Sequence, residues 1–369
     1  MKTNNILGII FANSHDALLR ELTETRSMAS VPFGARYRLV DFMLSNLTNA
    51  GVSKVGLVTK ANYFSLMSHL GNGKPWDLDR KIGGLSIYPP YSSGDAQVYK
   101  GRVEALYGIM ECLLESEEEY VILCDTDVIA NIDLRDVMNG HIENDADITV
   151  VYANGKKPKG QNDVMSFRFD KKGRITEVAF EDKDDCDYGL DVIILRRELL
   201  IDLVNEAYSN GLVSFSHGII DAKYKELKVY GYCHKGYVAV MDGVPSYFEA
   251  NKALLSADVR RDLFNPERPI YTNSKDDMPA KYGIESVVSN SLIADGCIID
   301  GEVKNCILFR DVIVAAGAVV ENSILMEGTT IGAGCELNYM ITDRFATVTE
   351  DKKLDGRQTK RIIGKKETV

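Results

Sequence analysis

The sequence has no surplus of positive charge and no long apolar run. Its 369 residues include 43 Lys and Arg against 54 Asp and Glu, so the formal net charge is −11. Proteins that bind nucleic acid hold the phosphate backbone with surplus Lys and Arg, and we therefore expect no nucleic-acid partner. The apolar run near the N-terminus is shorter than a signal-peptide core or a membrane span, which predicts a buried first strand and no membrane association.

Paired cysteines and clustered histidines are also missing. The seven cysteines are scattered without a C-x-x-C spacing. This pattern argues against a disulfide framework and against a zinc site. We interpret them as reduced cysteines of a cytoplasmic protein.

Glycine is absent from a turn where many α/β proteins hold a phosphate. Residues 9–23 read IIFANSHDALLRELT, so a predicted strand over 6–12 turns straight into a helix. Phosphate-binding turns of this kind need glycine, because backbone N–H groups approach the anion closely. Here the turn carries Asn13, Ser14, His15 and Asp16. These residues by themselves leave open whether the turn never bound phosphate or has lost that ability.

The first two-thirds of the chain alternate apolar runs with helical patterns. In DFMLSNLTNAG, residues 41–51, Phe42, Met43, Leu47 and Ala50 recur at helical spacing and Gly51 supplies a C-terminal cap. Runs such as YVILC are apolar throughout, as parallel strands covered on both faces are. We therefore predict a βαβ architecture with a mostly parallel sheet. The expected strands are 6–12, 55–59, 120–125, 148–152, 192–195 and 227–232.

A polar, proline-containing stretch over residues 265–283 predicts a linker, and the pattern changes beyond it. Aliphatic residues then recur every six positions, a period that suits a three-sided parallel β-helix with one inward side chain per short strand. A β-sandwich with accidental spacing is the alternative. We predict domains at 1–264 and 284–369, the second ending in a basic, solvated tail. The repeat positions are Ile307, Ile313, Val319, Leu325, Ile331 and Leu337.

Five motifs carry a resemblance to a known family. SVPFGARYRLVDFMLSN, GNGKPWDLDR, SIYPPY, VYKGRVEALY and FEANKALL are similar, in order and spacing, to the ADP-glucose pyrophosphorylase (glucose-1-phosphate adenylyltransferase) family. The resemblance covers nearly the whole chain. It implies a Rossmann-like nucleotidyltransferase domain followed by a left-handed β-helix of hexapeptide repeats. It also implies the family reaction, in which ATP and glucose 1-phosphate give ADP-glucose and pyrophosphate for glycogen or starch synthesis.

The first loop departs from the family pattern A-G-G-x-G-[ST]-R-L. The glycines of that pattern fall on Asn13, Ser14 and Asp16, its arginine falls on Leu18, and the lysine of a later Lys-Pro falls on Met28. Nucleotidyl transfer depends on positioning the phosphates and neutralising their charge. The loop has lost its glycines and both cations expected at the pyrophosphate, and Asp16 adds a carboxylate that repels a triphosphate. We therefore predict a dismantled phosphate loop.

Compared with the family pattern, this chain has only some of the residues expected at the magnesium and sugar-phosphate sites. Of the two family aspartates, the first matches Asp127 and the second falls on Val240, so we expect no bound cofactor on this chain and Mg²⁺ only in a catalytic partner. Asp242 would lie about 6.5–7 Å from Val240 along an extended strand. The open alternative is that Asp242 serves as the second magnesium ligand in place of Val240. Lys183 keeps the family position that contacts glucose 1-phosphate, and Asp182 stands for a glutamate. An exposed lysine in a charged loop is the alternative for Lys183.

Three arginines match a regulatory feature of the family. Arg26 and Arg38 match basic residues that bind anionic effectors between the two domains, and Arg36 stands where the family usually has lysine. Surface salt bridges are the alternative role. The segment with Trp76, the single tryptophan, is interpreted as a regulatory or subunit-contact loop.

The matches and departures together predict a catalytically degenerate regulatory subunit. The resemblance implies a heterotetramer with a catalytic homologue, whose activity this chain raises or modulates, and a sugar phosphate or nucleotide as the effector class. One alternative is a weakly active enzyme that uses Asp127, Asp242 and Lys183. Another is a stand-alone sugar-phosphate sensor, since a fold does not fix a function.

Overall fold

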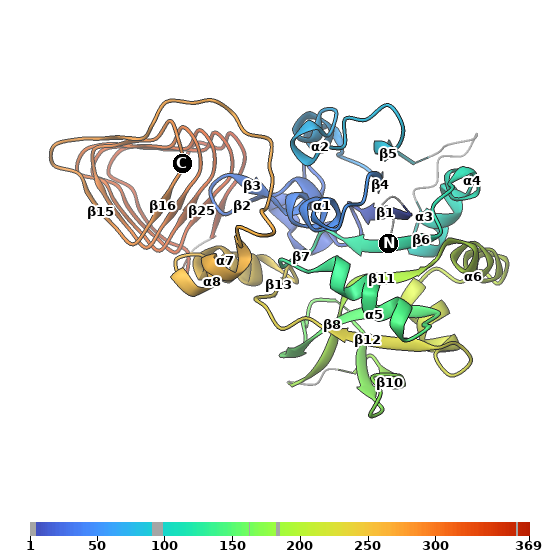
Figure 1. Cartoon of the computed structure of the whole chain (residues 1–369). Helices are drawn as coiled ribbons and strands as arrows, with labels where there is room; N and C mark the ends of the chain where they lie inside the picture. The colour runs from blue at the N-terminus through green and yellow to red at the C-terminus, as the bar shows by residue number, and fades with distance from the viewer. Residues whose placement is uncertain (1–4, 91–98, 162, 182–184, 359–360) are drawn as a thin grey trace.

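The computed structural model describes residues 5–90, 99–161, 163–181, 185–358 and 361–369. It shows an α/β part beside a stack of short strands (Figure 1). Within the described ranges, the helices are all too short or too polar to cross a membrane. All seven cysteines are free thiols.

Strand β1 (Ile6–Phe11) lies in the middle of a nine-stranded sheet. It is parallel to β4 (Lys54–Val58) on one side and to β6 (Tyr120–Asp125) on the other. The sheet is mixed, because β11 (Cys186–Arg196) runs antiparallel to β6 and to β8 (Ile148–Gly155). Each expected strand is present, and β11 is longer than expected. The other strands are β5 (Gly84–Tyr88), β9 (Ser166–Phe169), β10 (Ile175–Ala179) and β12 (Val229–Cys233).

Helices cover both faces of this sheet. Successive residues of β1 point to opposite faces, so they pack in two separate cores. Ile6 and Ile10 pack in one core with helices α1, α2 and α5, whereas Leu7 and Ile9 pack in a second core with α3, α4 and α6. The expected helix is α1, and Gly51 follows it at a φ of 83°. The helix bounds are α1 (Leu39–Asn49), α2 (Phe64–Leu70), α3 (Arg102–Gly108), α4 (Met110–Glu115), α5 (Leu134–Glu143) and α6 (Arg197–Ser209).

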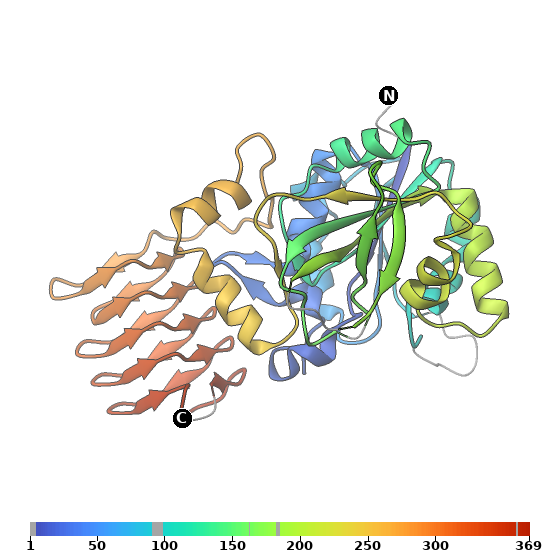
Figure 2. The same ribbon diagram turned by 90° about the horizontal axis from the view of Figure 1, so that it is seen from below.

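The C-terminal part is a parallel β-helix with three five-stranded sheets, which Figure 2 shows as a ladder of short strands. The first sheet contains β14 (Lys281–Tyr282), β17 (Ile298–Ile299), β20 (Ile313–Val314), β23 (Thr330–Ile331) and β26 (Thr347–Val348). The second contains β15 (Val287–Ser289), β18 (Glu302–Lys304), β21 (Val319–Glu321), β24 (Glu336–Asn338) and β27 (Lys353–Asp355). The third contains β16 (Leu292–Ile293), β19 (Ile307–Leu308), β22 (Ile324–Leu325), β25 (Ile341–Thr342) and β28 (Ile362–Ile363).

The repeat of six is right in kind, and Leu325, Ile331 and Leu337 lie in the interior as predicted. The register of the earlier positions is wrong. Ile307 pairs with Ile324, and Ile324 with Ile341, so each of these two coils takes 17 residues rather than three whole hexads. Leu308 and Val314 fill the interior, while Ile313 is 38% exposed. The uninterrupted step of six predicted Ile313 as an inward residue because it ignored the one-residue slip between the interior residues Val320 and Leu325.

The two parts share a hydrophobic core. Both views place helices α7 (Val244–Ala253) and α8 (Ala257–Leu263) where the α/β part meets the β-helix (Figures 1 and 2). Ile307, Ile324 and Ile341 belong to strands of the β-helix but face outward into this core, where they join Phe248 of α7 and Leu263 of α8. The apolar contact fixes the α/β part against the β-helix, so side chains from both can meet at one site.

Candidate functional site

The carboxyl ends of three parallel strands meet at one edge of the sheet. Phe11, the last residue of β1, lies opposite Asp125, the last residue of β6. The glycine-free turn follows β1 at this edge, and Asp127 follows β6 by two residues. Open α/β sheets bind their ligands outside such ends, so the turn and the two aspartates lie where the sequence places a nucleotide site.

The turn after β1 is closed on itself by side chains. The amide of Asn13 donates to Asp16 Oδ2 at 2.5 Å and to the carbonyl of Ala61 at 3.2 Å, and its oxygen accepts the Lys60 N–H at 2.9 Å. Asp16 Oδ1 accepts the Met28 N–H at 2.7 Å. Burial raises the pKa of Asp16. Asn13 and Asp16, at two positions where the family pattern has glycine, thus bond to each other and to neighbouring segments.

The residues at the two lost cation positions belong to the apolar interior. Met28 lies in the short 3₁₀ helix η3 (Met28–Ser30) and is buried in the core shared with the β-helix. Leu18, at the end of η1 (Asp16–Leu18), is half-buried against the same core. Neither position offers a charge to a phosphate. Asp182 and Lys183 lie outside the described residues.

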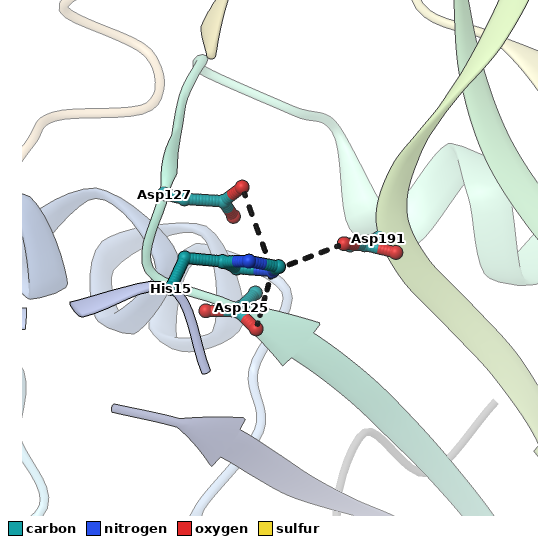
Figure 3. A group of neighbouring side chains, drawn as sticks. All are labelled: His15, Asp125, Asp127 and Asp191. Atoms are coloured by element: carbon teal, nitrogen blue, oxygen red, sulfur yellow. Dashed lines mark ion pairs between the residues drawn. The ribbon is translucent and has the colours of Figure 1, made fainter. Parts of the chain in front are cut away.

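The structure brings three aspartates and one histidine together at the sheet edge (Figure 3). His15 Nε2 is 3.7 Å from Asp125 Oδ2, 3.9 Å from Asp191 Oδ2 and 4.0 Å from Asp127 Oδ2. One ligand atom of each residue lies within 4.8 Å of those of the other three. We call these four residues the His15 cluster. Sequence reasoning singled out only Asp127 here, whereas the structure adds three further side chains.

Two other side chains hold the carboxylates of the cluster in place. Arg102, the first residue of α3, donates to Asp125 Oδ2 at 3.0 Å and to both oxygens of Asp191 at 3.1 and 2.7 Å. The side-chain amide of Gln161 donates to Asp127 Oδ2 at 2.6 Å. Asp191 reaches this position from an irregular part of β11, where its φ is 54°.

Burial and mutual repulsion govern the charges in the cluster. Burial, with the neighbouring Asp125 and Asp191 carboxylates, raises the pKa of Asp127 to about 7, although His15 opposes this rise. Burial disfavours the His15 imidazolium, but the three carboxylates outweigh that effect and raise the pKa of His15. For Asp191, burial is outweighed by Arg102, which lowers the pKa of that carboxyl.

The family's two-aspartate magnesium arrangement does not fit these residues. Val240 lies in the two-residue strand β13 (Ala239–Val240), which pairs with β7 (Val128–Ile129), and it offers no oxygen ligand from its side chain. Asp242 accepts the backbone N–H of Lys159 at 2.9 Å. Among the described residues, Asp242 is not part of the group around Asp127.

A second site is a cationic cavity of about 230 Å³ between the α/β part and the β-helix. It is lined by the three predicted arginines, Arg26, Arg36 and Arg38, together with basic residues of the β-helix and Glu327. We call it the interdomain cavity. The additional cations are Lys275, Arg310, Arg344 and Lys365.

The three predicted arginines have different surroundings. Arg26 is buried and donates to both oxygens of Asp343 at 2.7 Å. Arg38 donates to the carbonyl and the hydroxyl of Ser65, and burial beside Arg344 lowers its pKa to about 10. Arg36 is exposed. Arg26 is therefore neutralised by a buried partner, whereas Arg38 lies near other cations.

Sequence reasoning missed the cations that the β-helix contributes. Arg310 is 8% exposed, and its Nε and Nη2 atoms have no hydrogen-bond partner among the described residues. Arg344 forms an ion pair with Glu327 at 2.5 Å. Both arginines occupy turns of the β-helix, where the six-residue pattern carries no information about the direction of a side chain. Trp76, in the segment predicted as a regulatory or subunit-contact loop, is buried in the core with α1 and α2.

Comparison with known proteins is consistent with this architecture. Residues 7–256 match the model of the nucleotidyl transferase family, and residues 278–360 match a GlmU-like, C-terminal hexapeptide model. The chain is 32% identical over 370 residues to the glycogen biosynthesis protein GlgD of Bacillus subtilis, covering 100% of this chain and 98% of the relative. It is 37% identical over 320 residues to GlgD of Geobacillus stearothermophilus, covering 86% and 83%. It is also 30% identical over 384 residues to the glucose-1-phosphate adenylyltransferase of Clostridium perfringens, covering 100% and 96%.

Proposed function

The chain belongs to the nucleotidyl transferase family, and we propose that it acts there as a non-catalytic regulatory subunit of an ADP-glucose pyrophosphorylase. In this proposal it joins a catalytic homologue in a heterotetramer. It modulates the homologue's production of ADP-glucose from ATP and glucose 1-phosphate for glycogen synthesis. The similarity to two GlgD proteins, both named for glycogen biosynthesis, supports the pathway.

One observation carries the proposal: the turn after β1 is bonded to itself above three buried carboxylates. A phosphate cradle needs free backbone N–H groups and cations. Here the Asp16 carboxylate stands in the turn, bonded to the Asn13 side chain and to the N–H of Met28, and the acids of the His15 cluster outnumber Arg102. Loss of one well-placed donor costs roughly 2.7–4 kcal/mol of transition-state stabilisation. Several such losses together support an inactive chain.

An inactive subunit can still change the activity of its partner, because allostery is a coupling free energy between sites. The interdomain cavity supports a regulatory role, since seven basic side chains line a volume of about 230 Å³. Arg310 places unpartnered N–H groups there, within the described part of the chain. An anionic effector, such as a sugar phosphate, would satisfy these donors and bridge the α/β part and the β-helix.

The first coil of the β-helix supports association with another subunit. Its strands β14, β15 and β16 are the outermost members of their sheets. Met278, Tyr282 and Ile284 are exposed at this end, and Ile298 and Ile313 are exposed on the sheet to which β14 belongs. Exposed apolar surface beside open strand edges is typical of an interaction surface.

The test measures ADP-glucose formation with Mg²⁺, ATP and glucose 1-phosphate. We expect no turnover by this chain alone and altered turnover when it is co-expressed with a catalytic homologue. Ile284→Asp combined with Ile298→Asp should weaken the association, whereas Glu302→Gln, on the neighbouring sheet, should not. If the mixture shows only the homologue's own turnover and no complex forms, the proposal fails.

Two other outcomes would favour the alternatives. Magnesium-dependent turnover by the chain alone would indicate a weak pyrophosphorylase. Binding of a sugar phosphate to the interdomain cavity, without any complex with the homologue, would indicate a stand-alone sensor.

A further inference from the structure

We propose that His15, Asp125, Asp127 and Asp191 form a binding site for one divalent first-row transition metal ion. The site differs from the two-aspartate arrangement that the family resemblance implies. One of its ligands, His15, comes from the dismantled loop, and another, Asp191, comes from the irregular part of β11. The proposal does not depend on a regulatory function.

The geometry is that of four side chains facing one point. Figure 3 shows the His15 ring between the three carboxylates, with its Nε2 edge toward them. The distances from Nε2 to the carboxylates are 3.7, 3.9 and 4.0 Å, which is beyond hydrogen-bond range. Ligands at about 2.1 Å from a tetrahedral ion lie roughly 3.4 Å from one another. The distances from His15 to the carboxylates exceed this spacing by about 0.3–0.6 Å, and the four ligand atoms all lie within 4.8 Å of one another.

Two buried polar atoms point to a ligand independently of the spacing. Asp127 is 1% exposed, and its Oδ1 atom has no hydrogen-bond partner among the residues described. The Nε2 atom of His15 is buried and equally without one within the same ranges. Leaving buried polar atoms unpaired is costly, because they have lost their bonds to water. A metal ion bound by both atoms would remove that cost.

The net charge of the buried cluster is a third reason to expect a divalent ion there. Three carboxylates and the guanidinium of Arg102 leave two negative charges in a buried site when His15 is neutral. A divalent ion cancels both, and burial without such compensation is costly. Arg102 and Gln161 meanwhile hold the carboxylates from outside, as partners of metal ligands commonly do.

The donor set selects the class of ion. Imidazole favours Zn²⁺, Fe²⁺ or Co²⁺, whereas Mg²⁺ favours oxygen ligands in near-octahedral geometry and keeps several waters. One imidazole with three carboxylates therefore indicates a transition metal. A cavity of about 160 Å³, lined by His15, Lys60 and Tyr99, borders the cluster and offers a path for the ion.

The experiment uses the full chain without a histidine tag, treated with a chelator and then titrated with Co²⁺. Equilibrium dialysis measures the number of ions bound, and visible absorption reports their coordination. We expect one Co²⁺ per chain, displaced by equimolar Zn²⁺ but not by a hundredfold excess of Mg²⁺. His15→Gln should weaken binding at least tenfold. His217→Gln, which alters an exposed histidine 3.7 Å from Asp163, should leave binding unchanged.

Each contrary result would overturn the proposal. No saturable Co²⁺ binding would remove the site, and equal effects of His15→Gln and His217→Gln would show adventitious surface binding. Displacement by Mg²⁺ would show a site for hard cations built from carboxylates alone. Thermal unfolding without metal checks that each variant folds. If His15→Gln does not fold, Asp127→Asn takes its place with the same tenfold loss expected.

Discussion

Replacing Asp343 by Asn would leave the Arg26 guanidinium buried without its charged partner. Both side chains are about 2% exposed, and two bonds of 2.7 Å join them across the two parts of the chain. The other contact of Arg26 is to Met326 Sδ at 4.0 Å, which compensates little. Asn keeps the volume and an acceptor for the Arg344 N–H. The variant therefore isolates the lost charge.

The expected loss is about 3–5 kcal/mol of unfolding free energy, because the penalty is that of an unpaired buried charge. The assay is urea unfolding followed by tryptophan fluorescence, which Trp76 reports from the core. Glu336→Gln is the matched control, since it breaks an ion pair of the same β-helix whose side chains are 56% and 72% exposed. Exposed pairs contribute about 0–1 kcal/mol.

A double variant distinguishes the cost of an unpaired buried charge from the loss of the contact itself. Arg26→Met with Asp343→Leu removes both charges and leaves apolar side chains in their place, so it should recover most of the stability that Asp343→Asn loses. Equal urea midpoints for Asp343→Asn and Glu336→Gln would refute the argument. So would a double variant as unstable as the single one.

Three other outcomes are expected. Arg310→Gln should weaken the binding of inorganic phosphate at least fivefold in calorimetric titration, because it removes unpartnered donors from the interdomain cavity, whereas Arg168→Gln on the exposed part of β9 should not. Lowering the pH from 7 to 5 should remove about 2 kcal/mol of stability through His141, since burial and then Arg196 lower the pKa of this histidine to about 4. Leu18→Arg should restore no ADP-glucose formation in the enzyme assay, because the other defects of the loop remain.

The sign of the pH effect follows from proton binding. In the unfolded chain a histidine takes up a proton near pH 6.5, whereas folded His141 does so only near pH 4, so the stability present above pH 6.5 is lost as the pH falls. The Thr149 hydroxyl shares a hydrogen bond with the Nδ1 atom of His141, and the edge of one ring meets the face of the other where Tyr120 packs against this histidine. Asp147 favours the protonated, charged form of His141. His141→Gln should flatten the slope of urea midpoint against pH between 4 and 6.5. An unchanged slope would contradict the assignment.

The fold was predictable where burial on both faces leaves an apolar run. Strands β1, β4 and β6 are such runs, and their positions were confirmed. The first half of β11 does not stand out as a strand in the sequence, because Asp187 and Asp191 interrupt its apolar pattern. Strands β9 and β10 form an antiparallel pair with polar residues on one face. Their short alternation was too weak to recognise.

The candidate site was predictable only in part, because its residues come from segments that lie far apart in the sequence. The family pattern located Asp127, whereas His15 was noted only as a residue of the turn after β1. The approach of Arg102 and Asp191 depends on the first turn of α3 and on a strand irregularity some ninety residues apart. No motif in the sequence links these two residues to each other. The interdomain cavity has the same property, since its cations come from the α/β part and from several β-helix turns.

The departures of the loop from the family pattern support one another in the structure, which argues against reversing them one at a time. Asp16 accepts the backbone N–H of Met28, so a change to glycine would leave that buried donor unpaired. Met28 belongs to the core shared with the β-helix, together with Phe33 and Tyr247, so a lysine there would bury a charge. We therefore expect each single change to the family residue to cost stability. Because Met28 is part of the core that joins the two parts of the chain, we also predict that no such change by itself yields ADP-glucose formation.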